Sequence, residues 1–420
     1  MRNSSEQHAA PSDADRLRRI LILSADAGFG HKAAANAIAA AFEERHAGAC
    51  KSVIVNPLDH EDAPGLLVAA QDDYDRMIKD SPDLYRVGYQ ASDGALPVGI
   101  AEQALTVMLY GVIRDLLAEH EPDVVVTTYP LYQAPLATVG ALARRRTPFM
   151  TVVTDLVTVH KLWFHESAEA CLVPTQAVAD KAIESGLAPQ QVEITGLPVS
   201  PLLSQPVDKA ALRAKLGWSD DRVVALFAGS KRVTKLEPVI QILNHSGLPL
   251  ELAVVTGGNE ELLDRLDAEE WHQPAHVYGF VDNLWEMMQA ADFIVCKAGG
   301  LIVSESLAVG LPLLMVEAIP GQETGNAGYV TNGGAGALVD GPTEALMQVF
   351  HWMDRGGEAL RSAARQSRQL GRPDAAVRIA DRALDVAIHG PRPVTRGLVA
   401  QLPRLRELLG LDAPKAEPET

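Results

Sequence analysis

The segment with the most specific chemistry joins a strand to a helix at residues 297–307, Lys-Ala-Gly-Gly-Leu-Ile-Val-Ser-Glu-Ser-Leu. Two glycines make the turn and a helix begins near Leu301, so its first N–H groups have no helical partner and can bind an anion such as a diphosphate. Lys297 could add a positive charge beside that site. Glu305, about one turn into the helix, could accept hydrogen bonds from both hydroxyls of a ribose. The alternative for Glu305 is a glutamate that only stabilises the helix dipole.

Groups suited to sugar hydroxyls follow the next predicted strand, in residues 319–326, Ile-Pro-Gly-Gln-Glu-Thr-Gly-Asn. The Pro-Gly pair fixes a turn. Gln322 and Glu323 then bring an amide and a carboxylate to the mouth of the sheet, and together they offer the donors and acceptors that a sugar needs. A polar surface loop would be the preferred interpretation if the anion site were not directly upstream.

A candidate base lies in the first strand-to-helix turn, residues 24–32, Ser-Ala-Asp-Ala-Gly-Phe-Gly-His-Lys. Gly28 and Gly30 allow a tight turn and the close approach of a ligand. His31 falls in the first turn of the helix, whose dipole favours a neutral imidazole that can accept a proton. The motif is not the dinucleotide fingerprint, because Ala33 replaces the third glycine and no acidic residue directly follows the second strand. A histidine that caps or packs the helix is the alternative.

A carboxylate, Asp155, lies at the carboxyl end of another predicted strand, where open α/β sheets place their ligands. It could orient or charge-stabilise His31, or bind an acceptor hydroxyl. An aspartate that caps the following turn is an equally good interpretation. His160 and His165 are close in sequence, but no third ligand has a helical spacing from them, so we predict no metal site.

A flat base could lie on residues 279–285, Gly-Phe-Val-Asp-Asn-Leu-Trp, which follow a predicted strand. An apolar side chain next to free backbone amides is suited to that purpose. The segment is equally well explained as a strand-to-helix turn with Asp282 as the N-cap.

The elements that must position these residues are short apolar runs that alternate with Ala- and Leu-rich helical stretches. Runs that are apolar on both faces are typical of parallel strands covered by helices, so the alternation predicts an α/β fold. The predicted strands of the first half are residues 19–23, 52–55, 124–127, 149–153, 171–173 and 192–195. Those of the second half are residues 223–227, 250–255, 276–278, 293–296 and 312–316.

The chain therefore divides into two Rossmann-like halves that face a central cleft. Residues 196–201, Gly-Leu-Pro-Val-Ser-Pro, are typical of a linker. We place the first domain at 16–198 and the second at 199–356, followed by helices at 357–410 that pack back toward the first domain. Residues 1–15 and 411–420 are predicted to be disordered tails.

The length and composition of the chain exclude some classes of function. The 420 residues exceed the size of one hydrophobic core, which agrees with two domains. A net charge of −17 argues against nucleic-acid binding and against attachment to anionic lipid by charge alone. Cys50, Cys171 and Cys296 lie in or beside apolar runs, so we expect buried thiols in a reducing compartment. We find no secretory signal and no transmembrane segment in the sequence.

Together and in this order, the motifs resemble glycosyltransferase family 28, in the branch of monogalactosyldiacylglycerol synthase and processive diacylglycerol β-glucosyltransferase. The resemblance covers about residues 19–339. It is carried by Gly28-x-Gly30-His31, the run from Thr154-Asp155 to Trp163-Phe164-His165, Gly196-Leu197-Pro198-Val199, Lys297-Ala298-Gly299-Gly300 and Pro320-Gly321-Gln322-Glu323-x-x-Asn326. The last two motifs also resemble the N-acetylglucosaminyltransferase of peptidoglycan synthesis.

The resemblance implies a GT-B fold with an acceptor-binding first domain, a UDP-sugar-binding second domain, inversion at the sugar, and no metal or other cofactor. His31 would be the base with Asp155 near it, and Gly28, Phe29 and Gly30 would lie on the acceptor side. The donor would be held by Phe280 and Val281 at uracil, Glu305 at ribose, Lys297, Gly299, Gly300, Leu301, Ile302 and Val303 at the diphosphate, and Gln322, Glu323 and Asn326 at the sugar.

Two features depart from the family pattern. The loop after the first strand of the second half is usually glycine-rich, but here Ser230, Lys231 and Arg232 occupy it and could contact the diphosphate instead. Residues 61–110, on the acceptor side that would meet a membrane, carry nine acidic and three basic side chains. Anionic lipid would repel this segment unless apolar insertion dominates, and residues 144–146, three arginines, are the best basic counterweight.

We therefore expect an enzyme that transfers galactose or glucose from a UDP-hexose to diacylglycerol and makes a β-glycosyl diacylglycerol. Its expected place is the cytoplasm, bound peripherally at the inner face of the cell membrane. Three alternatives stay open: the same donor with a soluble acceptor, a non-catalytic UDP-sugar-binding module, and a UDP-sugar 2-epimerase.

Overall fold

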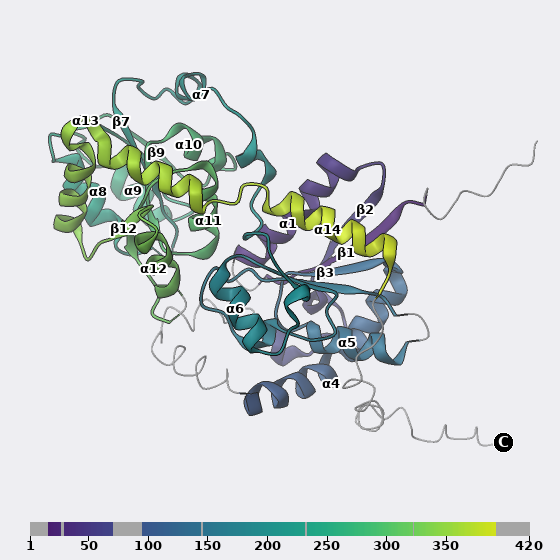
Figure 1. Ribbon diagram of the computed structural model, residues 1–420. Helices are drawn as coiled ribbons and strands as arrows, with labels where there is room; N and C mark the ends of the chain where they lie inside the picture. Colours follow the sequence, from purple (N-terminus) through teal and green to yellow (C-terminus); the bar gives the residue numbers. More distant parts are fainter. Residues whose placement is uncertain are drawn as a thin grey trace, which may run out of the picture.

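The computed structural model describes residues 16–26, 29–69, 95–143, 146–231, 233–321 and 323–391. It contains two parallel six-stranded sheets, one in each half of the chain, with helices on both faces (Figure 1). The predicted α/β architecture with two Rossmann-like halves is confirmed.

The first sheet has the order β2-β1-β3-β4-β5-β6. Its strands are β1 (Arg18–Leu23), β2 (Cys50–Val55), β3 (Val124–Thr127), β4 (Phe149–Val152), β5 (Ala170–Val173) and β6 (Val192–Ile194). The helices of this half are α1 (Phe29–His46), α4 (Ala95–His120), α5 (Gln133–Leu142) and α6 (Gln176–Glu184). The four inner strands, β1, β3, β4 and β5, are almost fully buried because helices cover both faces, which explains their apolar runs.

The second sheet has the order β12-β11-β10-β7-β8-β9. Its strands are β7 (Val223–Ala228), β8 (Leu250–Val255), β9 (Ala275–Tyr278), β10 (Phe293–Lys297), β11 (Leu313–Glu317) and β12 (Gly336–Leu338). Its helices are α7 (Lys209–Leu216), α8 (Leu236–Asn244), α9 (Glu260–Asp267), α10 (Leu284–Ala290), α11 (Gly300–Val309), α12 (Thr324–Asn332) and α13 (Pro342–Leu370).

Every strand predicted from the sequence is present, with ends shifted by two residues at most. Strand β12 was not predicted, because it is only three residues long and follows Gly333 and Gly334. Gly336 is needed there, since a Cβ on it would lie 2.1 Å from the carbonyl oxygen of Leu313 on the neighbouring strand. Close backbone approach, rather than side-chain pattern, specifies this strand.

Strand order reverses once in each sheet, between β1 and β3 in the first and between β7 and β10 in the second. At such a switch point the two neighbouring loops leave the sheet in opposite directions and open a crevice at the carboxyl ends of the strands. Helix α1, with His31 in its first turn, follows β1, and the glycine turn at 299–300 follows β10. Both candidate sites therefore occupy the positions that the topology opens to a ligand.

The chain crosses between the halves twice, and the two crossings touch. Gly196, in the first crossing, has a φ of +96°, and a Cβ on it would lie 2.4 Å from the Cβ of Arg372 in the second. The next helix, α14 (Ala375–His389), packs on α1 and β1 of the first half (Figure 1).

The second crossing comes later than the predicted boundary at residue 357. Helix α13 has a kink at Asp354–Gly357 but continues to Leu370 against the second half. The Cδ1 of Leu370, for example, lies 2.4 Å from the place of a Cβ on Gly333. Within residues 357–391, only α14 packs back on the first half, because the apolar residues of 358–370 pack against the second half.

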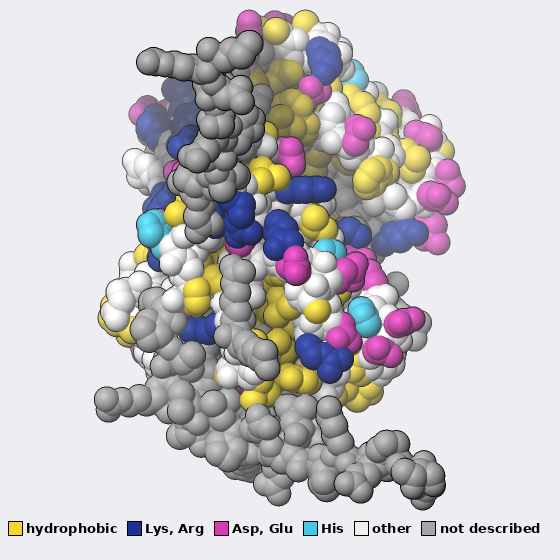
Figure 2. Space-filling view, turned by 90° about the vertical axis from the view of Figure 1, so that its right-hand side faces the viewer, with side chains coloured by type: hydrophobic (Ala, Val, Ile, Leu, Met, Phe, Trp, Pro, Cys, Tyr) yellow, Lys and Arg dark blue, Asp and Glu magenta, His cyan; other side chains and the backbone are white. Residues whose placement is uncertain are grey.

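The cysteines, the surface charge and the helices can each be compared with what the composition predicted. Cys50, Cys171 and Cys296 are all buried free thiols, as predicted. Lys and Arg side chains gather in a band across the middle of the face shown in Figure 2, so the net charge of −17 is unevenly distributed. None of the helices in the described part of the chain combines the length and the apolar character that crossing a bilayer requires.

Candidate functional site

His31 is fixed by two oxygen atoms of the first sheet. Its Nδ1 lies 2.9 Å from the carbonyl oxygen of Thr128 and 2.7 Å from Oγ1 of Thr154. A carbonyl can only accept a hydrogen bond, so Nδ1 carries the proton in the neutral ring. The lone pair is then on Nε2, which is the nitrogen that a general base would use.

The surroundings of His31 keep it neutral. The ring of Tyr129 meets it edge-on at a centroid distance of 4.9 Å, and Trp163 lies 6.0 Å away. Burial lowers the pKa of His31 to about 4, and the hydrogen bond with Thr128 opposes that shift. The sequence argument assigned the neutral state to the helix dipole, whereas the structure assigns it mainly to burial among aromatic rings.

Asp155 contacts the indole ring of Trp163, which lies beside His31. Its Oδ2 accepts a hydrogen bond of 2.7 Å from the indole Nε1 of Trp163. Burial raises the pKa of Asp155 to about 6, although the Trp163 hydrogen bond and the charge of Lys181 both lower it. Among the described residues, the hydrogen bonds of His31 go to Thr128 and Thr154, so Asp155 reaches His31 through Trp163.

His160 and His165 each form a hydrogen bond within their own loop. The Nδ1 of His160 accepts a hydrogen bond from the N–H of Leu162, and the Nδ1 of His165 accepts one from the N–H of Ser167. Both histidines therefore close local turns. Within the described ranges, no group of three or more His, Cys, Asp or Glu side chains could hold a metal ion.

On the second half, α11 presents an open N-terminus. Its N-cap, Gly299, has no side chain to cap the helix. The N–H groups of Gly300, Leu301 and Ile302 form no hydrogen bond with any described residue. These donors and the positive end of the helix dipole are the features on which the predicted anion site depends. Val303 continues this helix as a buried residue.

Lys297 and Glu323 were assigned separate roles from the sequence, but they form an ion pair. The Nζ of Lys297 lies 2.6 Å from Oε1 of Glu323, and both side chains are largely buried. The second oxygen of Glu323 accepts a hydrogen bond from the N–H of Ile319. The charge of Lys297 is thus already balanced, and the pair joins the end of β10 to the loop after β11.

Glu305 is a carboxyl group without a partner. It forms no hydrogen bond or ion pair with the residues that the structure describes, and burial raises its pKa to about 7. Asn326 donates from Nδ2 to the carbonyl oxygen of Ala298, while its buried Oδ1 has no hydrogen-bond partner among the described residues. Both residues therefore offer acceptors beside the N-terminus of α11.

The remaining predicted donor residues follow β7 and β9 of the second sheet. Phe280 is 80% exposed, which leaves its ring free for stacking, and Val281 packs on the core of the second half. Ser230 and Lys231 follow β7, next to the switch point. On the predicted acceptor side, Gly30 is the second residue of α1, with open space where a Cβ would lie.

Several predictions lie outside the described residues. They are Gly28, Arg232 and Gln322, the two tails, Arg144 and Arg145, and residues 70–94 of the acidic segment. The side chain of Phe29 is also outside the description.

The two halves meet at the loop after β4, and this contact unites the candidate sites. A Cβ on Gly300 would lie 3.7 Å from the carbonyl oxygen of Thr154 and 3.7 Å from the Cβ of Leu156. A Cβ on Gly325 would lie 2.6 Å from Oγ1 of Thr158. Residues 154–158 of the first half are thus inserted against the first turns of α11 and α12.

Sequence reasoning missed Thr128 and Thr154 as supports of His31. Thr154 was quoted only as part of the motif around Asp155. Thr128 follows β3, the strand next to β1, and would have been found by asking which loops meet at the switch point.

Comparison with known proteins identifies the family. Residues 31–199 match the family model for monogalactosyldiacylglycerol (MGDG) synthase, and residues 223–379 match the glycosyltransferase family 28 C-terminal domain. The chain is 32% identical over 373 residues to the monogalactosyldiacylglycerol synthase of Spinacia oleracea, covering 86% of this chain and 71% of that protein. The chain belongs to the MGDG synthase family.

A second relative gives the same result. Monogalactosyldiacylglycerol synthase 1 of Arabidopsis thaliana is 30% identical over 378 residues, which cover 87% of this chain and 70% of that protein. Membership in the MGDG synthase family and the family 28 domain make this protein a hexosyltransferase, as predicted.

Solved structures confirm the predicted GT-B fold. MurG of Acinetobacter baumannii superposes with a TM-score of 0.57 at 15% identity, covering 88% of this chain and all of that one. The glycosyltransferase SnogD of Streptomyces nogalater gives a TM-score of 0.55 at 15% identity, with the same coverage of both chains. A putative UDP-N-acetylglucosamine 2-epimerase of Listeria monocytogenes gives 0.58. Transferases and epimerases share this fold, so the family and the site decide the function.

Proposed function

We propose that this protein transfers a hexose from a UDP-sugar to the free hydroxyl of diacylglycerol and produces a β-glycosyl diacylglycerol. The proposal depends mainly on one observation. A neutral histidine and an open helix N-terminus lie on opposite sides of the contact between the two halves, and Thr154 contacts both. Its relatives in the MGDG synthase family support diacylglycerol as the acceptor and galactose as the sugar.

In the proposed mechanism, Nε2 of His31 removes the proton from the acceptor hydroxyl. The hydroxyl oxygen forms a bond to the anomeric carbon as the bond from that carbon to the β-phosphate oxygen breaks. Attack from the face opposite the leaving group inverts the anomeric centre. UDP departs with the bonding electron pair, and the proton stays on His31 until solvent or product release removes it.

The departing UDP carries negative charge that must be stabilised. The free N–H groups of Gly300, Leu301 and Ile302 are suited to this, since they are fixed donors that need no reorganisation when charge develops. We propose that they replace a metal ion in this role. Negative charge on the diphosphate would also raise the pKa of His31 in the donor complex, which improves a base whose pKa is about 4 in the free protein.

Glu305 and Phe280 are proposed to bind the nucleoside. The carboxylate of Glu305 has both oxygens available for the two ribose hydroxyls, and the exposed ring of Phe280 can stack on uracil. We propose that Asn326 and the Glu323 carboxylate, which Lys297 and Ile319 hold in place, bind the sugar.

We propose a peripheral position at a membrane, where diacylglycerol is found. Exposed apolar side chains of the first half support this: Leu66 is 73% exposed, Ile100 63% and Val107 43%. Apolar insertion of this kind would compensate for the repulsion between an acidic segment and anionic lipid. A soluble acceptor is the alternative that the acidic segment favours.

The test is an acceptor assay with the purified full chain, diacylglycerol in mixed micelles, and UDP-galactose or UDP-glucose in parallel, with EDTA present. Mass spectrometry of the lipid should detect hexosyl diacylglycerol, with UDP-galactose the better donor. His31→Ala serves as the matched inactive control. Release of UDP without any lipid product would reject diacylglycerol as the acceptor and favour a soluble one.

A further inference from the structure

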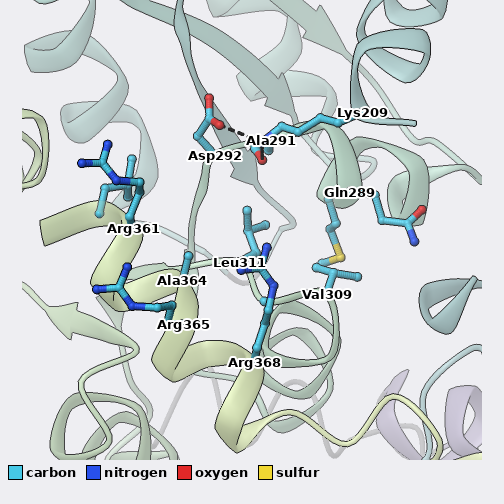
Figure 3. Close-up of a pocket in the computed structure, with 13 residues that line it drawn as sticks. Lys209, Gln289, Ala291, Asp292, Val309, Leu311, Arg361, Ala364, Arg365 and Arg368 are labelled. Atoms are coloured by element: carbon cyan, nitrogen blue, oxygen red, sulfur yellow. Dashed lines mark hydrogen bonds and ion pairs between the residues drawn. The ribbon is translucent and has the colours of Figure 1, made fainter. Parts of the chain in front are cut away.

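A hollow of about 360 Å³ lies on the second half, away from the seam between the halves. It is formed at the amino ends of β10 and β11, opposite the edge of the sheet that carries the donor site. Its walls are α7, the ends of α10 and α11, and the last part of α13 (Figure 3). The site is therefore separate from the one assigned to UDP-sugar.

The charges that line this hollow are strongly unbalanced. They are Lys209, Arg361, Arg365 and Arg368, against the single carboxylate of Asp292. Asp292 is already paired, because Nζ of Lys209 lies 2.7 Å from it and Nη2 of Arg213 lies 2.6 Å from it. The three arginines of α13 are left without a carboxylate partner in the hollow.

The arginines have few other interactions. Arg365 and Arg368 form no hydrogen bond or ion pair with the residues that the structure describes. Within the same described ranges, Arg361 donates only to the neutral carbonyl oxygen of Gly356, at 2.6 Å. Several guanidinium donors are thus free to bind oxygen atoms of a ligand.

Without a bound anion, the spacing of these arginines destabilises α13. They occupy positions i, i+4 and i+7, so they share one face of α13, and like charges so placed destabilise a helix. Residues 361–372 contain four arginines and no acidic residue, in a chain whose net charge is −17. This segment is therefore positively charged although the whole chain is negatively charged, and an anion site requires positive charge.

Packing holds one of the arginines in place. Gly310 has a φ of +72°, and a Cβ on it would lie 2.3 Å from Cγ of Arg368. The aliphatic part of Arg368 therefore crosses this glycine closely, and its position does not depend on an ion pair. The apolar side chains of Val309, Leu311 and Ala364 line the space between the charged groups (Figure 3).

We propose that this hollow binds a phosphate monoester, with Arg361, Arg365 and Arg368 as the ligands of the phosphate group. Arginine forks match phosphate oxygens, and the apolar lining suits a small organic group attached to the phosphate. The phosphate could belong to a soluble metabolite or to a lipid headgroup. The competing explanation is that the arginines only stabilise the carboxyl end of α11, which requires no ligand.

The test uses the full chain with UDP present at saturation, so that the donor site is occupied. Binding of glycerol 3-phosphate is measured by calorimetry, with glycerol as the control. In a parallel arm, cosedimentation compares phosphatidylcholine vesicles with and without phosphatidic acid. The double variant Arg365→Gln/Arg368→Gln is compared with Arg355→Gln, whose arginine is 90% exposed on α13 and does not line the hollow.

At least tenfold weaker binding in the double variant, with unchanged binding in Arg355→Gln, supports the site in whichever arm it occurs and names the source of the phosphate. A Tm measured without ligand shows that the variants are folded. Arg365→Lys, which keeps the charge but loses the fork, should give an intermediate affinity. Absence of binding in both arms, or binding that the double variant retains, overturns the proposal. Loss of hexosyl transfer is not a readout here, so this site and the proposed function fail independently.

Discussion

The hydroxyl oxygen of Thr154 lies 2.7 Å from Nδ1 of His31, which places a side chain from the end of β4 in contact with a side chain from the start of α1. The carbonyl of the same threonine faces Gly300 at the N-terminus of α11. One residue therefore contacts both the proposed base and the helix proposed to hold the diphosphate. The distance between these groups is set by the packing of the two halves.

We expect Thr154→Val to reduce kcat roughly fivefold, because one hydrogen bond worth about 1 kcal/mol would no longer orient the imidazole. Thr154→Ser keeps the hydroxyl and should retain nearly full activity. The KM for the UDP-sugar should change little in either variant. A serine variant as impaired as the valine variant would show that the methyl group, and not the hydrogen bond, is needed.

His31→Ala should lower kcat by roughly 10²–10⁴-fold, the usual contribution of a positioned general base. UDP affinity should be unchanged, since the proposed UDP ligands lie on the other half. Calorimetry with UDP and the lipid product assay measure the two effects separately. Unchanged turnover would remove His31 from the mechanism.

The protonation of His31 can be measured directly by NMR of its imidazole nitrogens. The ring should be neutral with its proton on Nδ1 at pH 6–7, because the carbonyl of Thr128 requires a donor there. Burial lowers the pKa to about 4, so the ring should become charged only as the pH falls through that value. Titration near the ordinary value of 6.5 would contradict the burial that the structure gives this residue.

At the contact between the two halves, we expect one substitution to reduce activity and a second to restore it. Gly325→Ala would place a Cβ 2.6 Å from Oγ1 of Thr158, so it should separate the halves and reduce activity. Thr158→Ala removes that oxygen and should restore much of the activity in the double variant. Gly328→Ala, on the same helix with nothing within 4 Å of the new Cβ, is the control that should remain active. A double variant no better than Gly325→Ala would place the defect elsewhere.

Glu305 predicts a pH dependence of nucleoside binding. Its pKa is about 7, so the carboxylate that accepts both ribose hydroxyls is present above that pH and is lost as the pH falls. The Kd of uridine should rise roughly 5–10-fold from pH 8 to pH 6, and this dependence should vanish in Glu305→Gln. Uridine is preferred to UDP because it has no phosphate that titrates in this range. A flat Kd in the unmodified protein would remove Glu305 from the ribose site.

Burial of Glu305 should also lower the free energy of unfolding where its carboxyl group is ionised. The folded pKa of about 7 lies above the ordinary value of 4.5, so folding opposes ionisation of Glu305. The penalty is absent below about pH 4.5 and complete above about pH 7. Glu305→Gln should therefore increase the free energy of unfolding at pH 8, by on the order of 2 kcal/mol, and have little effect at pH 4. Denaturant titrations at the two pH values measure the difference.

The local features of the fold followed from the sequence because neighbouring residues determine them. Two glycines after an apolar run predicted the turn before α11, and the helix begins there at Gly300. His31 falls in the first turn of α1 for the same reason. Both predictions needed only the pattern of a strand, a turn and a helix.

Contacts between distant segments were not predictable in this way. The Lys297–Glu323 ion pair depends on β10 and β11 being neighbours, and the contact of His31 with Thr128 depends on β1 and β3 being neighbours. Strand order comes from the packing of whole halves, which no local pattern contains.

The position of α14 has a consequence for how the protein is made. Ile379 and Ala383 of this helix pack in the same apolar cluster as Ile38 and Phe42 of α1. A ribosome releases the first half long before it synthesises α14, so this apolar surface is bare during most of translation. The half that is made first is completed late, and a nascent chain of this enzyme needs protection from aggregation until α14 emerges.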